Sequence, residues 1–141
     1  MSKVAVVYWS STGNTEAMAS AVAEGVKSQG GEAALLTADA FNESMVDSYD
    51  AIAFGCPAMG AEVLEESEFQ PMWDSCKGKL SGKKIALFGS YGWGDGEWMR
   101  DWEEDCRSAG AVLACESVIC NNEPDDEATE GCKALGIELA K

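Results

Sequence analysis

Hydrophobic residues occur along the chain in short continuous runs, separated by segments with a helical period. Four runs are almost entirely apolar and a fifth is partly alternating; they span residues 4–9, 33–37, 51–55, 85–90 and 112–119. Continuous apolar runs of this length are typical of strands covered on both faces, as in a parallel sheet. The pattern therefore predicts a five-stranded parallel sheet with helices on both faces.

Three segments between or after these runs place apolar residues three or four positions apart, as amphipathic helices do. Their apolar positions are Met18, Val22 and Val26, followed by Gly30 and Gly31; Trp98 or Met99, Trp102, Cys106 and Ala109, before Gly110; and Ala128, Cys132, Leu135 and Leu139. A short helical piece is expected at residues 43–48, and another helix with Pro71 as its first residue. The alternation predicts one doubly wound α/β domain over residues 1–141, with right-handed crossovers.

The charge of the chain restricts the partners that it can bind. Its 25 acidic and 10 basic residues give a formal net charge of -15. Nucleic-acid binding needs clustered Lys and Arg, so nucleic acid is excluded as a partner. The acidic surface favours proteins with basic patches, which long-range attraction would bring into fast encounter, although solubility alone is an equally simple reason for the charge.

The cysteines and the missing histidine exclude several kinds of chemistry. The chain has six cysteines without a C-x-x-C pair and no histidine, which argues against zinc sites, thioredoxin-type redox pairs and histidine-dependent nucleophiles. No apolar run approaches the length of about 20 residues that spans a bilayer, and residues 1–11 lack a signal-peptide pattern. We therefore expect no membrane segment and a cytoplasmic location with reduced cysteines, of which Cys76, Cys106 and Cys132 pack in the core.

The loop SSTGNT at residues 10–15 joins the first strand to the first helix. Ligands of doubly wound sheets lie at the carboxyl ends of the strands, and a helix N-terminus offers unpaired N–H groups to an anion. The loop surrounds Gly13 with uncharged donors, which are Ser10, Ser11, Thr12, Asn14 and Thr15. Such a ring of donors fits a phosphate monoester, although the loop has neither the Walker nor the dinucleotide pattern. The alternative is simple helix capping by Thr12 or Asn14.

Two further loops carry residues suited to a flat ligand. Trp93 lies between Gly92 and Gly94 after the fourth run, and Met59 precedes Gly60 after the third. An indole and a thioether can cover the two faces of a planar ring, although Trp93 could instead fold back over the sheet. A phosphate at one end and a planar ring at the other describe flavin mononucleotide (FMN).

Three segments, SSTGNT, CPAMGAEVLEESEF and LFGSYGWGDGEWMRDWEE, resemble the short-chain flavodoxins of clostridial type, and the resemblance covers nearly the whole chain. It implies a flavodoxin-like strand order of 2-1-3-4-5 and non-covalently bound FMN. The implied function is that of a low-potential one-electron carrier, not an enzyme, that shuttles between redox proteins through semiquinone and hydroquinone states. The resemblance further implies a monomer that docks transiently on partners with basic patches.

Carried over by position, the resemblance assigns the FMN phosphate to residues 10–15, the outer ring face to Trp93 and the inner face to Met59. The carbonyl of the Gly60–Ala61 peptide would turn toward flavin N5, and Glu62 would accept a hydrogen bond from N3. The complete set of expected FMN contacts is Ser10, Ser11, Thr12, Gly13, Asn14, Thr15, Pro57, Ala58, Met59, Gly60, Ala61, Glu62, Ser90, Tyr91, Gly92, Trp93, Gly94 and Asn122. Two positions depart from relatives: Pro57 offers neither hydroxyl nor N–H to the phosphate, and Ala61 stands where Asp or Ser is common.

Three other functions share parts of this pattern. A pyridine-nucleotide-dependent flavoenzyme would need room for a dinucleotide, for which the chain has no separate segment. A phosphoacceptor domain would need clustered Asp at the ends of the first and third strands, which instead read YWSS and FGCP. A cofactor-free interaction module would yield a colourless protein.

Overall fold

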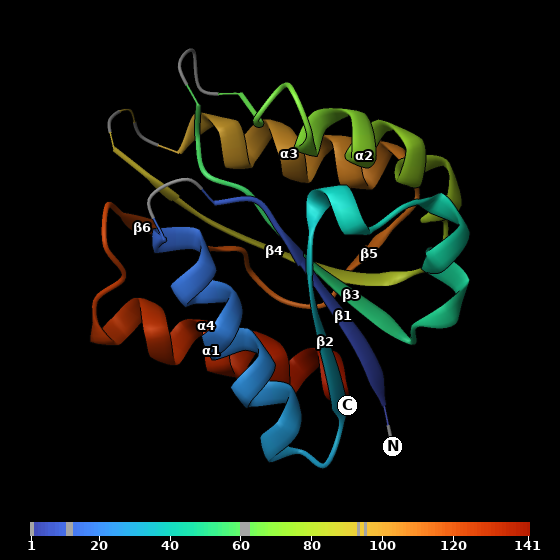
Figure 1. Ribbon diagram of the computed structural model, residues 1–141, viewed down its shortest axis with the longest axis horizontal. Coiled ribbons are helices and arrows are strands. Elements are labelled where there is room, and N and C mark those ends of the chain that lie inside the picture. The colour runs from blue at the N-terminus through green and yellow to red at the C-terminus, as the bar shows by residue number, and fades with distance from the viewer. Residues whose placement is uncertain (1, 11–12, 60–62, 93, 95) are drawn as a thin grey trace.

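The computed structural model describes residues 2–10, 13–59, 63–92, 94 and 96–141. A parallel sheet lies between two helical layers, with α2 and α3 on one face and α1 and α4 on the other (Figure 1). The strands are β1 (Lys3–Tyr8), β2 (Glu32–Thr37), β3 (Ala51–Gly55), β4 (Lys84–Tyr91), β5 (Val112–Leu113) and β6 (Val118–Asn121). The α-helices are α1 (Asn14–Ser28), α2 (Phe69–Cys76), α3 (Glu97–Ser108) and α4 (Asp126–Ala140), and 3-10 helices span Ala38–Ala40, Glu43–Ser48 and Lys77–Lys79.

The strand order is β2-β1-β3-β4-β5, as predicted, and every pairing between these strands is parallel. Val6 of β1 lies opposite Leu35 of β2 on one side and Ala53 of β3 on the other. After β1 the chain therefore forms β2 on one side of β1 and then β3 on its other side. The reversal between β1 and β3 is the position where doubly wound sheets bind ligands.

The fifth strand differs from the prediction of one run over residues 112–119. Two segments, β5 and β6, pair with the start and the end of β4, and β6 continues to Asn121. Between the pairs Leu113–Ile85 and Val118–Phe88, this strand advances five residues while β4 advances three. The two extra residues cannot be accommodated in a regular ladder, so the ladder is interrupted between Leu113 and Val118, although the Ala114 N–H still donates to the Ile85 carbonyl at 2.9 Å.

The strand β2 was expected to be covered on both faces, and this expectation is wrong. The strand lies at the edge of the sheet, and each of its residues is exposed or half-buried, with Leu35 45% exposed. The central strand β3, in contrast, is buried at all five positions. A continuous apolar run therefore indicates a strand here but does not distinguish an edge strand from a central one.

The predicted helices are present, with one shifted boundary. α2 begins at Phe69, so Pro71 is its third residue rather than its first, a position in the first turn where its missing N–H costs no helical hydrogen bond. The expected core positions Cys76, Cys106 and Cys132 are fully buried. No helix within the described ranges is long and apolar enough to cross a membrane.

The two helices on the α1 side pack with their backbones in close approach. A Cβ atom at Gly25 of α1 would collide with the carbonyl of Lys133, and one at Gly136 of α4 would collide with the carbonyl of Val22. These glycines therefore allow α1 and α4 to approach closely over the lower face of the sheet in Figure 1. The packing fixes the axis of α1 and so the position of its N-terminus.

Candidate functional site

A cavity of about 190 Å³ lies at the carboxyl edge of the sheet, where the chain leaves β1, β3, β4 and β6. It brings together four loops that are far apart in the sequence. Its lining residues are Ser10, Asn14, Thr15, Pro57, Ala58, Met59, Ser90, Tyr91, Gly92 and Asn122. All ten belong to the set of residues predicted to contact the cofactor.

The N-terminus of α1 forms one side of this cavity. Gly13 is the N-cap with φ of 93°, and among the described residues no side chain caps the helix. A Cβ at Gly13 would meet no atom within 4 Å, so the left-handed backbone, rather than crowding, favours glycine there. The simple capping role considered for Asn14 is wrong, because Asn14 is the first helical residue. The helix therefore presents uncapped N–H groups and the positive end of its dipole to the cavity.

Two hydroxyl groups meet at the base of the cavity. Thr15 Oγ1 and Ser90 Oγ lie 3.2 Å apart, and the two residues are 1% and 5% exposed. At the rim, Ser10 Oγ accepts a hydrogen bond of 3.1 Å from the Gly13 N–H. The hydroxyls thus lie near the helix N-terminus, and the described residues that line the cavity include no charged group.

The loop after β3 is held at both of its described ends. The Ala58 N–H donates to the Ser90 carbonyl at 3.0 Å. Met59 and Val63 form a reciprocal pair of main-chain hydrogen bonds, with N···O distances of 2.9 and 3.2 Å. The pair thus joins the two described ends of this loop.

Glu65 fixes the far end of this loop, a role that the sequence did not reveal. Its buried carboxylate accepts hydrogen bonds from the N–H groups of Ser67, Glu68 and Phe69 at 2.7–2.8 Å and from the Ser67 hydroxyl. Burial alone would raise the pKa of Glu65, but these four donors outweigh it and hold the pKa below its ordinary value. The carboxylate therefore satisfies the N–H groups of the two residues before α2 and that of its first residue, Phe69.

The opposite rim of the cavity is built by Tyr91, Gly92 and Asn122. Asn122 is the only non-glycine residue with positive φ in the described part of the chain, at 58°, and its N–H donates to the Tyr91 carbonyl at 2.7 Å. A Cβ at Gly92 would lie 3.5 Å from the Asn122 side-chain oxygen. The loop after β6 is therefore pinned to the end of β4.

A second cavity of about 380 Å³ adjoins the first at Ser10 and carries acidic residues. Gly13 lines this neighbour together with Glu16, Asp39 and Glu68. Trp9 Nε1 donates to Glu68 Oε1 at 3.0 Å, which connects the end of β1 to the residue before α2. Three negative side chains thus line the cavity that adjoins Ser10 and Gly13.

The remaining predicted residues are placed as follows. Gly94 has a φ of 89° and is not among the residues that line the cavity. The other six lie outside the described residues: Ser11, Thr12, Gly60, Ala61, Glu62 and Trp93. Their contacts with FMN stay predictions.

Residues 6–136 match the protein-family model described as Flavodoxin. The chain belongs to the flavodoxin family. It is 47% identical to a flavodoxin of Clostridium beijerinckii over 135 residues, which cover 96% of this chain and 97% of that protein. It is 46% identical to a flavodoxin of Megasphaera elsdenii, with 98% of each chain covered.

The fold agrees with this family assignment. The solution structure of two-electron reduced Megasphaera elsdenii flavodoxin superimposes with a TM-score of 0.90, at 46% identity, over 97% of this chain and 98% of that one. As a flavodoxin, the chain is a small FMN-binding electron carrier and not an enzyme. Bound FMN supplies the capacity to take up and release electrons. The uncapped helix N-terminus and the paired hydroxyls fit the phosphate of that cofactor.

Proposed function

We propose that the cavity at the ends of β1, β3 and β4 holds the FMN of a low-potential one-electron carrier. The observation that carries this assignment is the meeting of Asn14, Thr15 and Ser90 with Met59 and Asn122 around one cavity. The first three residues offer uncharged hydrogen-bond donors, and Met59 offers a soft apolar surface. These are the two kinds of contact that a phosphate and a planar ring require.

The phosphate lies at residues 10–15 in this proposal. Support comes from the free N–H groups at the start of the 15-residue helix α1 and from the Thr15 and Ser90 hydroxyls. Oriented N–H and O–H dipoles can hold an anion without a Lys or Arg side chain. Pro57 lines the same cavity and contributes no donor, so the phosphate relies on the other three segments.

The ring lies between Met59 and Trp93, beside the Gly60–Ala61 peptide and Glu62. The pairing of Met59 with Val63 supports this arrangement, because it positions the Met59 side of the loop at the cavity. The described residues that line the two adjoining cavities include no Lys or Arg and include Glu16, Asp39 and Glu68. The surroundings therefore disfavour additional negative charge on the ring.

The effect of nearby carboxylates on the reduction potential can be put in numbers from Coulomb's law. One unit charge about 12 Å away contributes about 1.4 kcal/mol at an effective dielectric constant near 20. A free energy of about 1.4 kcal/mol corresponds to about 59 mV for one electron. A few carboxylates near the ring are therefore sufficient to lower the potential of the more reduced couple.

The partners in this proposal are redox proteins that present basic docking patches and bind transiently. The net charge of -15 supports electrostatic attraction to such patches. The chain forms one domain over residues 1–141 and acts as a monomer, as its resemblance to short-chain flavodoxins suggests. All six cysteines are free, which fits a reducing cytoplasmic location.

Titration of the cofactor-free protein with FMN tests the assignment. Flavin fluorescence is expected to be quenched with one FMN bound per chain, and riboflavin is expected to bind more weakly because it lacks the phosphate. Stepwise reduction should then resolve two one-electron midpoint potentials, the second one low. A protein that leaves flavin fluorescence unchanged would refute the proposed site.

A further inference from the structure

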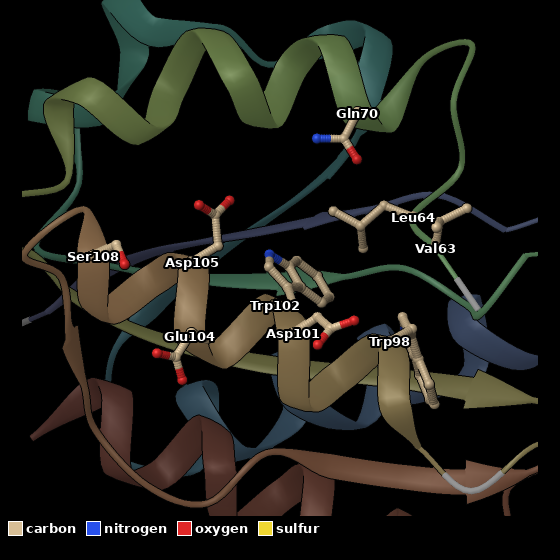
Figure 2. Close-up of a pocket in the computed structure, with 9 residues that line it drawn as sticks. All are labelled: Val63, Leu64, Gln70, Trp98, Asp101, Trp102, Glu104, Asp105 and Ser108. Atoms are coloured by element: carbon tan, nitrogen blue, oxygen red, sulfur yellow. The ribbon is translucent and has the colours of Figure 1, made fainter. Parts of the chain in front are cut away.

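A groove of about 380 Å³ lies between α2 and α3, in the helical layer on the other side of the sheet from α1 and α4. Figure 2 shows Gln70 of α2 pointing toward α3, with the indole of Trp102 between them and Val63 and Leu64 at one end. Trp98, Trp102 and Leu64 are 2%, 2% and 7% exposed, and Val63 is 41% exposed. The groove therefore has an apolar floor that opens to solvent near the loop after β3.

Carboxylates occupy the α3 wall of this groove. Asp101, Glu104 and Asp105 lie three and four positions apart, so they share one face of the helix. The Asp105 carboxylate accepts a hydrogen bond of 2.7 Å from Trp73 Nε1 and forms an ion pair with Lys77 Nζ at 3.5 Å. Asp101 and Glu104 are exposed and have no ion-pair partner within the described part of the chain. Asp101 and Glu104 lie one helical turn apart and repel each other, so a cation bound between them would relieve this repulsion.

The floor of the groove carries a second, independent feature. Trp102 Nε1 is buried and has no hydrogen-bond partner among the described residues. The three other indoles that the structure describes are all paired, with Trp9 bound to Glu68, Trp73 to Asp105 and Trp98 to the Cys56 carbonyl. A buried N–H donor without an acceptor is uncommon, so this indole is available to an acceptor oxygen that enters the groove.

We propose that this groove is the docking site for a basic, extended segment of a redox partner. Lys or Arg side chains of the segment pair with Asp101 and Glu104, an apolar side chain packs on Val63 and Leu64, and a main-chain carbonyl accepts the Trp102 N–H. A polyamine or a metal ion would satisfy the carboxylates but leave the indole without an acceptor. The occupant reaches the indole when the Gln70 side chain, bound to exposed Asp74 at 3.0 Å, turns aside.

The groove is connected to the proposed cofactor cavity through one pair of residues. Val63 at its open end exchanges two main-chain hydrogen bonds with Met59, which lines the cavity. A partner in the groove thus contacts the same loop that lines the proposed cofactor cavity. This step rests on the proposed function, which makes the chain a carrier that needs such partners.

The test uses ¹⁵N-labelled, FMN-loaded protein and a blocked pentapeptide of alternating Lys and Leu as the probe. The indole N–H resonance of Trp102 is first assigned from its couplings to the other atoms of the same side chain. This resonance is expected to shift downfield as the peptide is added. The corresponding Glu–Leu peptide should leave it unchanged. No shift of this resonance with the basic peptide, or shifts confined to other parts of the protein, would overturn the proposal.

Matched charge variants provide the second measurement. Asp101→Asn with Glu104→Gln is expected to weaken binding of the basic peptide about tenfold, as the loss of two ion pairs would. The control, Glu32→Gln with Glu127→Gln, has the same net charge but changes exposed carboxylates of β2 and α4, so it should change binding less than about twofold. Equal weakening in both would indicate non-specific attraction and overturn the proposal. Both double variants should bind FMN normally, so a failure of this docking site and a failure to bind FMN are separate results.

Discussion

The indole Nε1–H of Trp98 donates a hydrogen bond of 3.1 Å to the main-chain carbonyl of Cys56, and both residues are buried. Trp98 lies in the first turn of α3, and Cys56 immediately precedes the loop that contains Met59. The ring of Trp98 also packs against Tyr91, with 5.5 Å between the ring centroids. One side chain therefore connects the starts of the two loops proposed to hold the flavin ring.

Replacing Trp98 with Phe should weaken FMN binding. The substitution keeps an aromatic ring but removes the N–H, which leaves the buried Cys56 carbonyl without this donor and loosens the loop beside Met59. We expect the dissociation constant for FMN to rise about tenfold, measured by quenching of flavin fluorescence.

The variant Trp73→Phe is the matched control. Trp73 is also buried and loses one indole hydrogen bond, that to Asp105 near the other end of α3, and neither residue lines the cofactor cavity. Each variant should lose about 1–3 kcal/mol in the free energy of unfolding. Trp73→Phe should change FMN affinity less than about twofold, and an equal loss of affinity in both variants would argue against a positioning role for Trp98.

The Thr15 hydroxyl is expected to act on the phosphate rather than on the ring. Thr15→Val keeps the shape of this buried side chain and removes the hydroxyl that lies 3.2 Å from Ser90. Hydrogen bonds to charged groups contribute about 1.5–3 kcal/mol, so FMN affinity should fall at least about tenfold. Riboflavin affinity should stay the same, and a parallel loss of riboflavin binding would contradict the phosphate assignment. Thr129→Val, which removes an exposed hydroxyl on α4, should leave both affinities unchanged.

The sequence predicted the layout of this fold because each local pattern agreed with its tertiary environment. The runs that became β1, β3 and β4 are buried on both faces, and the spacing of Ala128, Cys132, Leu135 and Leu139 gave the buried side of α4. The split between β5 and β6 could not be predicted, because it arises from two residues in excess of the partner strand. Such an excess is a property of the pairing, not of either segment alone.

The sequence predicted the part of the candidate site where hydrogen-bond donors directly follow a strand. It did not predict the contacts between residues that are far apart in the sequence. The small polar residues of 10–15 identified the N-terminus of α1, and the strand order placed Ser90 beside it. The pattern gave Trp98 only a core position and gave Glu65 no role. Nothing in either local pattern indicates that the Trp98 indole bonds the Cys56 carbonyl, or that the Glu65 carboxylate caps α2. Those partners are set by the packing of α3 and by the path of the loop.

The cysteines should differ sharply in their reactivity. Burial raises the pKa of the Cys56, Cys106 and Cys132 thiols to about 12, and Cys115 is the one cysteine that is partly exposed. Burial also raises the pKa of Cys115, so its alkylation should be slow near neutral pH. Mass spectrometry of folded protein treated with iodoacetamide should show one adduct, at Cys115, and six adducts after unfolding. Modification of Cys56 in the folded protein would contradict the packing described here.

Glu65 should make the stability of the protein depend on pH in the acid range. Its pKa in the folded protein lies below the ordinary value of 4.5, because the hydrogen bonds from residues 67–69 outweigh the effect of burial. The stabilisation is therefore fully present above about pH 4.5 and is lost as the pH falls through the lower folded-state value. At pH 7, Glu65→Gln should lower the free energy of unfolding by about 1–3 kcal/mol.

Urea unfolding of both proteins at several pH values checks this expectation. The difference between wild type and Glu65→Gln should shrink below pH 4.5, since the protonated glutamic acid then resembles the amide. The neighbouring variant Glu66→Gln changes an exposed carboxylate and should differ from wild type by less than about 0.5 kcal/mol at pH 7. A constant difference between Glu65→Gln and wild type at every pH would show that the charge of Glu65 does not stabilise the start of α2.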